Sequence, residues 1–398
     1  MCSLRVLSGL CAGVAMLLAV VLSVSAQDAG GMDLDIIKEV PSSNWSDPNA
    51  GPNAQPKTET NPLDRDFESA LDAYRGRDYV TARDKWSDLT DAGHGLSMHN
   101  LAVLKWRGQG GPREQSEALE LFRDAGQNKV PQSLHALGVL SLRGAGVSPD
   151  AGEAVRYFKA ASDLDHPPSM YNLALAHLKG IGGAGDTARG MELMTAAAEA
   201  GLARAQYDLG TLLYNGTYTG ADKPAARMWF ERAAENGDPF GYYNLAQMQF
   251  AGEGGPPDPE LAATNLTEAA EMGAVPAQVR LAHLLAAGGP GVGKDPAGAY
   301  AWFRIAGALG AEGALENAKR LGRTLTERQR AEGKRRAAAF QPKRPPETVP
   351  DADASPARNA ETAPDTAPAP DIPAAPQPDT VSDKDAKEAE DLLKTLQQ

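Results

Sequence analysis

A leucine followed by a small residue recurs every 36 residues through the central part of the chain. The leucines are Leu101, Leu137, Leu173, Leu209, Leu245 and Leu281, and a glycine follows each of them seven positions later, at Gly108, Gly144, Gly180, Gly216, Gly252 and Gly288. Six consecutive matches to one period of this length are typical of a solenoid of helix pairs. The period therefore predicts an all-α chain that grows by adding units.

Each unit also contains signals for the ends of its two helices. The glycine is the residue type that ends a helix most easily, because it adopts the left-handed conformation without strain. An aspartate then begins the second helix, because its carboxylate accepts a hydrogen bond from a free backbone N–H group. These predicted caps are Asp150, Asp186, Asp222, Asp258 and Asp295, the last one residue late because the preceding loop has an insertion.

The second helices carry a column of large residues with alanine three positions after each. The large residues are Phe122, Phe158, Met194, Phe230, Leu266 and Phe303. A large side chain opposite a small one allows neighbouring helices to pack closely. We expect this column to form the core, with each helix pair burying its apolar face against its neighbours.

Several stretches of these units resemble a known repeat. Tyr171-Asn172-Leu173-Ala174, the stretch 229–237 and Gly144-Ala145-Gly146-Val147 before Asp150 are similar to the Sel-one-like repeat, a branch of the tetratricopeptide-like superfamily. The resemblance covers about residues 95–310 in six units and implies a right-handed superhelical solenoid of antiparallel helix pairs. The chain departs from the family in lacking a regular tyrosine four positions after the leucine and the cysteines that some secreted relatives have in every repeat.

The segments on either side predict additional helices and disordered termini. Before the repeats, we assign 27–62 to a disordered linker and 63–94 to a tetratricopeptide-like helix pair. After them, we assign 311–340 to capping helices, the last of which starts at Thr324 or Thr326. We assign 341–382 to a Pro/Ala/Asp-rich disordered tail and 383–398 to a short charged helix or disorder.

The first 26 residues have the pattern of an export signal. Arg5 precedes an apolar run over residues 6–24, and Val24-Ser25-Ala26 places small residues before a cleavage site. We therefore expect cleavage after Ala26 and a periplasmic location. Secretion and an uncleaved membrane anchor are the alternatives, and no membrane span remains after cleavage. Both cysteines lie in this segment, so the mature chain would have no disulfide.

Charge and motifs argue against several functions. With 39 basic and 52 acidic residues the net charge is −13, which disfavours nucleic acid as a partner. The six histidines have no metal-ligand spacing. The stretch 180–185 matches the G-x-G-x-x-G pattern, but a predicted helix precedes it where a dinucleotide site needs a strand. We expect no cofactor, no metal and no enzymatic activity.

One face of the first helices carries aromatic residues with polar tips, which suit peptide binding. The candidate partner-binding residues are His135, Tyr171, Tyr207, Tyr214, Tyr243, Gln247 and Phe250. In the superfamily this face lines a concave groove. Packing between adjacent repeats is an equally good explanation of the same column.

These observations predict a monomeric, non-catalytic scaffold that binds a protein or peptide in the cell envelope. The resemblance implies a regulator or adaptor of an envelope sensor, secretion or assembly system. Two alternatives remain open at this stage. One is a hydrolase directed at the cell wall or at β-lactams, as for some cysteine-rich relatives, and the other is a secreted host-interaction factor.

Overall fold

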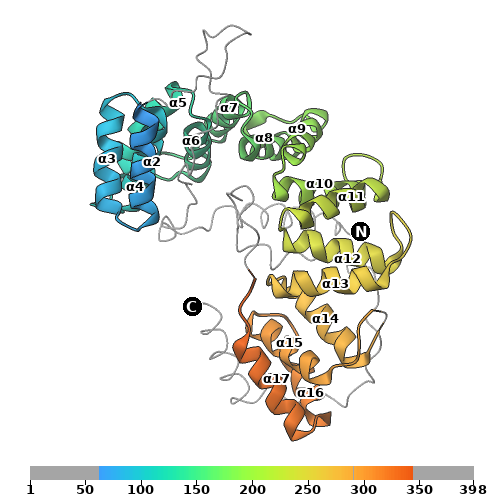
Figure 1. Cartoon of the computed structure of the whole chain (residues 1–398). Coiled ribbons are helices and arrows are strands. Elements are labelled where there is room, and N and C mark those ends of the chain that lie inside the picture. Colours follow the sequence, from blue (N-terminus) through green and yellow to red (C-terminus); the bar gives the residue numbers. More distant parts are fainter. Residues whose placement is uncertain (1–61, 290, 344–398) are drawn as a thin grey trace, which may run out of the picture. The chain divides into compact units, whose positions relative to one another are not determined.

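The computed structural model describes residues 62–289 and 291–343. Within these ranges the chain forms sixteen α-helices, one short 3-10 helix and no strand beyond an isolated bridge between Gly289 and Val292 (Figure 1). The all-α prediction is confirmed. The predicted signal peptide, nearly all of the predicted linker, and the predicted tail and terminal helix from residue 344 onward lie outside the described residues.

The chain divides into two compact units at residue 166. The first unit contains three antiparallel helix pairs, α2 to α7. Their bounds are Pro62–Arg75, Tyr79–Asp91, Gly95–Arg107, Gln115–Gln127, Pro131–Arg143 and Ala151–Ser162.

The second unit contains five helix pairs, α8 to α17, with the 3-10 helix η1 (Ile181–Gly183) after α8. The bounds of α8 to α17 are Pro167–Lys179, Thr187–Glu199, Ala203–Asn215, Lys223–Glu235, Pro239–Ala251, Pro259–Glu271, Val275–Ala287, Pro296–Ala308, Ala314–Thr324 and Glu327–Ala339.

The predicted helix caps are confirmed. Asp150, Asp186, Asp222, Asp258 and Asp295 each accept a hydrogen bond from the backbone N–H three residues later. The glycines at the ends of α4, α6, α8, α10 and α12 are left-handed, with φ between 65° and 70°. Gly288 differs, with φ 76° and ψ 143°, because the insertion after it turns the chain into a longer loop.

The G-x-G-x-x-G stretch is an inter-helix loop, as predicted. It follows α8 and contains η1, and Asp186 directly after it caps α9. Since no strand leads into this loop, its glycines serve the turn between two helices.

The ends of the solenoid differ from the prediction in two small respects. The first helix begins at Pro62, one residue earlier than expected, since proline is tolerated in the first helical turn. The last helix begins after Thr326, one of the two predicted starts, because Thr326 forms a capping box with Gln329. Residues 341–343, assigned to a disordered tail, are instead held against α13 by Lys343.

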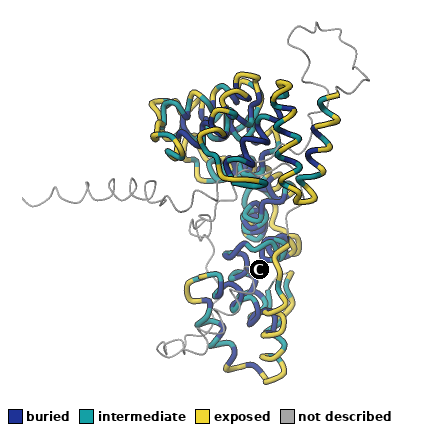
Figure 2. Tube along the Cα trace, turned by 90° about the vertical axis from the view of Figure 1, so that its left-hand side faces the viewer, coloured by how far each residue is buried: buried dark blue, intermediate teal, exposed yellow. Residues whose placement is uncertain are grey.

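The core follows the predicted column. Phe122, Met194, Leu266 and Phe303 are no more than 1% exposed, and Phe158 and Phe230 no more than 3%. In Figure 2 buried residues line the helix faces turned toward neighbouring helices, while exposed residues gather on loops and outer faces. Leu142 on α6 lies outside this column and is 43% exposed. Within each unit the fold thus holds the first helices in a repeating array.

Candidate functional site

The seven predicted partner-binding residues lie on successive first helices. His135 belongs to α6 in the first unit, and the other six belong to α8, α10 and α12 in the second. Tyr171 and Tyr243 are buried, at 5% and 9% exposure, and the other five are half-buried. The structure therefore distributes these residues along the array, one repeat after another.

Tyr171 joins its own repeat to the next one. Its hydroxyl donates a hydrogen bond of 2.6 Å to Oδ2 of Asp208 on α10, and Nε of Arg204 donates to the same oxygen at 3.1 Å. The Arg204 guanidinium also lies over the Tyr171 ring, 5.9 Å from its centroid. Burial raises the pKa of the Tyr171 phenol and the Asp208 charge raises it further, so the hydroxyl remains a donor.

Tyr207 has a similar position one repeat later. Its ring lies 5.9 Å from that of Phe230 and 6.1 Å from that of Phe240 on α12. Burial raises the pKa of the Tyr207 phenol, and hydrogen bonding with Thr211 and Asn244 opposes this rise. Asp208 and Asn244 each lie 37 positions after the tyrosine they meet, so the same contact recurs in two adjacent repeats.

Tyr243 and Gln247 interact with each other on α12. The Gln247 side-chain amide donates to the Tyr243 hydroxyl at 3.3 Å, one helical turn apart. Tyr243 is part of a buried cluster with Leu266 and Leu281, against which Phe250 also packs. Of these side chains, Gln247 and Phe250 are accessible enough to contact a partner.

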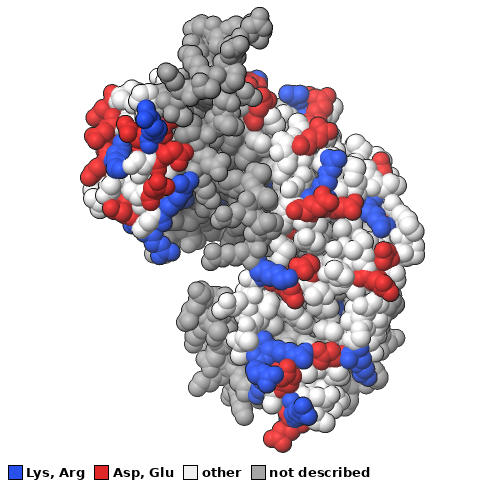
Figure 3. Space-filling model, viewed as in Figure 1, with Lys and Arg blue, Asp and Glu red and all other residues white. Residues whose placement is uncertain are grey.

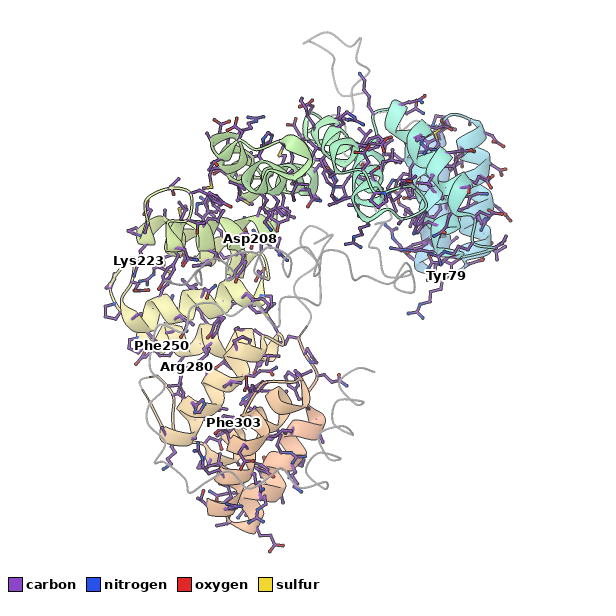
Figure 4. The ribbon with its side chains drawn as sticks, turned by 180° about the vertical axis from the view of Figure 1, so that it is seen from behind. Tyr79, Asp208, Lys223, Phe250, Arg280 and Phe303 are labelled. Atoms are coloured by element: carbon purple, nitrogen blue, oxygen red, sulfur yellow. The ribbon has the colours of Figure 1, made fainter. Side chains whose placement is uncertain are left out.

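Tyr214 lies at the end of α10, beside a charged pair. Its hydroxyl donates to Oε2 of Glu253 at 2.7 Å, and Lys223 pairs with the same carboxylate. Lys223 Nζ lies 5.1 Å from the centre of the Tyr214 ring. Figure 4 labels Asp208, Lys223 and Phe250 on α10, α11 and α12. The hydrogen bond from Lys223 is the main reason why the pKa of the Glu253 carboxyl lies below its usual range.

His135 packs its ring against two other rings in the first unit, both at a tilted angle. Its ring lies 5.6 Å from Phe158 and 5.1 Å from His166. Burial and, to a smaller extent, the neighbouring His99 lower the pKa of His135 to about 4. This imidazole is therefore neutral near pH 7 and serves as a packing element there.

The structure thus shows inter-repeat contacts for the predicted column, which is the packing alternative left open by the sequence. The partner-binding role of the seven residues stays a prediction. Sequence reasoning missed the polar residues that bind the tyrosine hydroxyls, among them Asp208 and Glu253. A signal for Asp208 existed, because it shares a register with Asn172 and Asn244 directly before the repeated leucine.

Replacing Tyr171 with phenylalanine should weaken the junction between α8 and α10. The substitution keeps the ring and removes the hydroxyl that bonds to Asp208, a charge-assisted hydrogen bond worth about 1–3 kcal/mol. We expect the opening free energy of α8 and α10 amides to fall by about 1–2 kcal/mol in hydrogen exchange. Tyr218→Phe is the control, because Tyr218 is exposed and its hydroxyl makes a long hydrogen bond without charge, 3.5 Å to the Leu178 carbonyl of α8. An equal loss in both variants would contradict the assignment.

Two features are absent from the part of the chain that the structure describes. Residues 62–289 and 291–343 contain no group of three or more His, Cys, Asp or Glu side chains arranged to hold a metal ion. Among the helices of the same ranges, none combines the length and the apolar character that a membrane crossing needs.

Six consecutive segments of the chain match the profile of one family, the Sel1 repeat. The matched segments are residues 95–129, 131–166, 167–202, 203–238, 239–273 and 275–310. The chain belongs to the Sel1 repeat family. The resemblance noted in the sequence is confirmed, and each matched segment contains one first helix and one second helix of the structure. Sel1 repeats generally serve as non-catalytic scaffolds for protein interaction.

Solved structures agree with this fold. A Sel1 repeat protein from Oxalobacter formigenes has a TM-score of 0.54 at 22% identity, covering 61% of this chain and 96% of that one. A protective antigen of uropathogenic Escherichia coli strains with an SLR fold has a TM-score of 0.51 at 23% identity, covering 70% and 69%. At these identities the similarity shows the fold alone. No curated protein matches the chain in sequence.

Proposed function

We propose that this Sel1 repeat protein is a non-catalytic scaffold that binds a protein or peptide partner through the first helices of its second unit. Membership of the Sel1 family is the observation that carries the proposal, because repeats of this family generally mediate protein binding. The helix array gives the scaffold an extended surface on which one partner can contact several repeats.

The second unit supports the proposal through side chains that remain accessible. Tyr207, Tyr214, Gln247 and Phe250 are half-buried on α10 and α12. Aromatic residues fixed by packing lose little conformational entropy on binding, and their polar tips can exchange hydrogen bonds with a partner. Tyr207 contacts Phe240, Tyr214 binds Glu253, and the neighbouring Tyr171 binds Asp208. These contacts would then hold the surface in place before a partner binds.

We further propose that the scaffold acts in the bacterial periplasm as a regulator or adaptor. The support is the sequence of residues 1–26, with Arg5, the apolar run and Val24-Ser25-Ala26. Secretion to a host and a hydrolytic activity toward the cell wall are the competing functions. Secretion predicts that the chain is missing from the periplasmic fraction, and a cell-wall hydrolase needs no protein partner whose recovery depends on the tyrosines tested next.

The test is a crosslinking pull-down from periplasmic extract with the full chain as bait. Tyr207→Ala combined with Tyr243→Ala is expected to reduce recovery of the specific partner at least tenfold. The first change removes a half-buried ring from the surface, and the second removes the buried tyrosine that binds Gln247 and belongs to the cluster supporting Phe250. Tyr207→Phe combined with Tyr243→Phe keeps the rings and should retain most of the partner. Circular dichroism of each variant verifies that the helices are intact.

The matched control replaces two exposed apolar residues on the second helices of the same unit. These are Met228 on α11 and Leu261 on α13, at 40% and 45% exposure. If Met228→Ala with Leu261→Ala loses the partner and the tyrosine pair does not, the binding surface has been assigned to the wrong helices. Absence of the chain from the periplasmic fraction would contradict the proposed location.

A further inference from the structure

The segment that follows the last helix turns back along the second unit. After α17 ends at Ala339, residues 340–343 run to the end of α13, where the orange-red trace meets that helix in Figure 1. Phe340 has φ −69° and ψ 130°, an extended conformation. Pro342 fixes its own φ and favours an extended conformation at Gln341. We call residues 340–343 the C-terminal strap.

Three kinds of contact hold the strap. The Phe340 ring meets Trp302 of α15 edge to face, with centroids 5.1 Å apart. The Lys343 backbone N–H donates to the Glu271 carbonyl oxygen at 2.8 Å, satisfying one of the free carbonyls at the end of α13. Lys343 Nζ donates to both oxygens of Glu268, at 3.1 and 3.0 Å, and lies 2.5 Å from Glu271 Oε2.

The surface under the strap differs from the equivalent surface of the other repeats. Glu268 and Glu271 are one helical turn apart on α13. Shifting this pair back by one period gives Arg232 and Glu235, and by two periods Ala196 and Glu199. The doubled carboxylate is therefore a feature of α13 among these three second helices. It lies beside the helix-end carbonyl that the Lys343 N–H reaches, while the Trp302 ring receives Phe340 at the other end of the strap. The ring of Trp302 suits an aromatic side chain, and the two carboxylates suit a lysine three positions later in the same peptide.

Helix α17 closes the end of the solenoid with contacts of its own. Arg336 of α17 already pairs with Asp295, the cap of α15, and with Glu332. A Cβ atom at Gly333 would lie 2.7 Å from the Ala297 carbonyl oxygen and from the Tyr300 ring, so α17 packs closely on α15 through its own residues. Phe340 adds its ring to the edge of the cluster that Ala301, Ile305 and Ala337 form between the two helices. In Figure 3 basic and acidic side chains lie side by side over this end of the second unit.

The lysine contacts are of a kind that can be exchanged. The side chains of Lys343, Glu268 and Glu271 are 51%, 39% and 34% exposed, and exposed ion pairs contribute little to stability. A segment attached to the same chain nevertheless has a high effective concentration, on the order of millimolar. The strap can therefore occupy the surface while remaining displaceable.

We propose that Trp302, Glu268, Glu271 and the end of α13 form a recognition site for an extended peptide with an aromatic residue three positions before a lysine, and that the strap fills this site in cis. A partner segment with this pattern must displace the strap, so the chain regulates its own binding. This inference rests on the proposed scaffold function and names the partner chemistry for one surface of it.

The test uses the full chain and a fluorescein-labelled, C-terminally amidated peptide with the sequence of residues 338–343. Phe340→Ala with Lys343→Glu releases the strap and should increase the affinity for the peptide at least tenfold over wild type, because the cis competitor is lost. Adding Glu268→Gln and Glu271→Gln should reverse the gain. Lys343→Glu alone keeps Phe340 packed on Trp302 and serves as a second released variant should the double variant lose helicity.

The matched control is Lys334→Glu, which makes the same charge change at an exposed position of α17 and should bind the peptide as wild type does. Equal binding to wild type and to the released chains overturns the inference, as does failure of the released chains to bind at millimolar peptide. A peptide with glutamate in place of lysine must bind at least tenfold more weakly. Since this titration needs no natural partner, its failure leaves the pull-down result unaffected.

Discussion

Replacing Phe122 with alanine is expected to lower the opening free energy of the amides in α4, α5 and α6 by about 3–5 kcal/mol. Phe122 is fully buried, and its ring lies 5.4 Å from that of His99 on α4. It belongs to one cluster with Trp86, Trp106 and Leu137, so its removal leaves a cavity between consecutive repeats. In a solenoid each repeat contacts only its neighbours, and the loss should be largest close to the substitution.

Hydrogen exchange with mass spectrometry measures this effect segment by segment, which suits a repeat array that need not unfold in one step. Leu142→Ala is the matched control in the same unit. Its side chain is 43% exposed, so we expect a change within about 0.5 kcal/mol. Similar losses in the two variants would show that the 36-residue column does not define the core.

Mild acid is expected to destabilise the first unit through the packed imidazoles of His135 and His166. Burial lowers the pKa of His135 to about 4, with a smaller contribution from His99. Burial also lowers the pKa of His166 well below its ordinary value, with smaller contributions from His135 and His99. The unfolded chain binds protons at these positions near pH 6.5, whereas the folded chain does not. Stability is therefore complete above about pH 6.5 and falls as the pH drops toward 4, by up to about 3 kcal/mol for His135.

His135→Tyr tests this expectation with a residue that the repeats themselves supply. The equivalent position is tyrosine in the next three repeats, at Tyr171, Tyr207 and Tyr243, so the substitution suits the packing and removes one titrating group. Chemical denaturation between pH 4 and 7 should show a shallower pH dependence for the first unit in this variant. His177→Tyr in the second unit is the control, and an unchanged slope in His135→Tyr would refute the explanation.

The sequence determined the helices and their ends to within a residue or two. Gly144 and Asp150 carry this information locally, since a left-handed glycine ends one helix and a carboxylate begins the next whatever lies further away. Gly288 shows the limit of such reasoning, because the insertion after it gave that glycine a different backbone conformation from its equivalents. The sequence also identified the column headed by Phe122 as core, because a period of 36 places those residues at equivalent positions in every repeat.

The tertiary structure alone decided which side chains meet across repeats. The period gave Tyr171 and Tyr207 the same register, but it could not say that their hydroxyls reach Asp208 and Asn244, since that depends on the distance and rotation between helices. It gave no sign that Lys343 returns to Glu268, because the two are 75 residues apart and belong to different patterns. Local signals such as caps are contained in a few neighbouring residues, whereas contacts between distant segments exist only once the helices have packed.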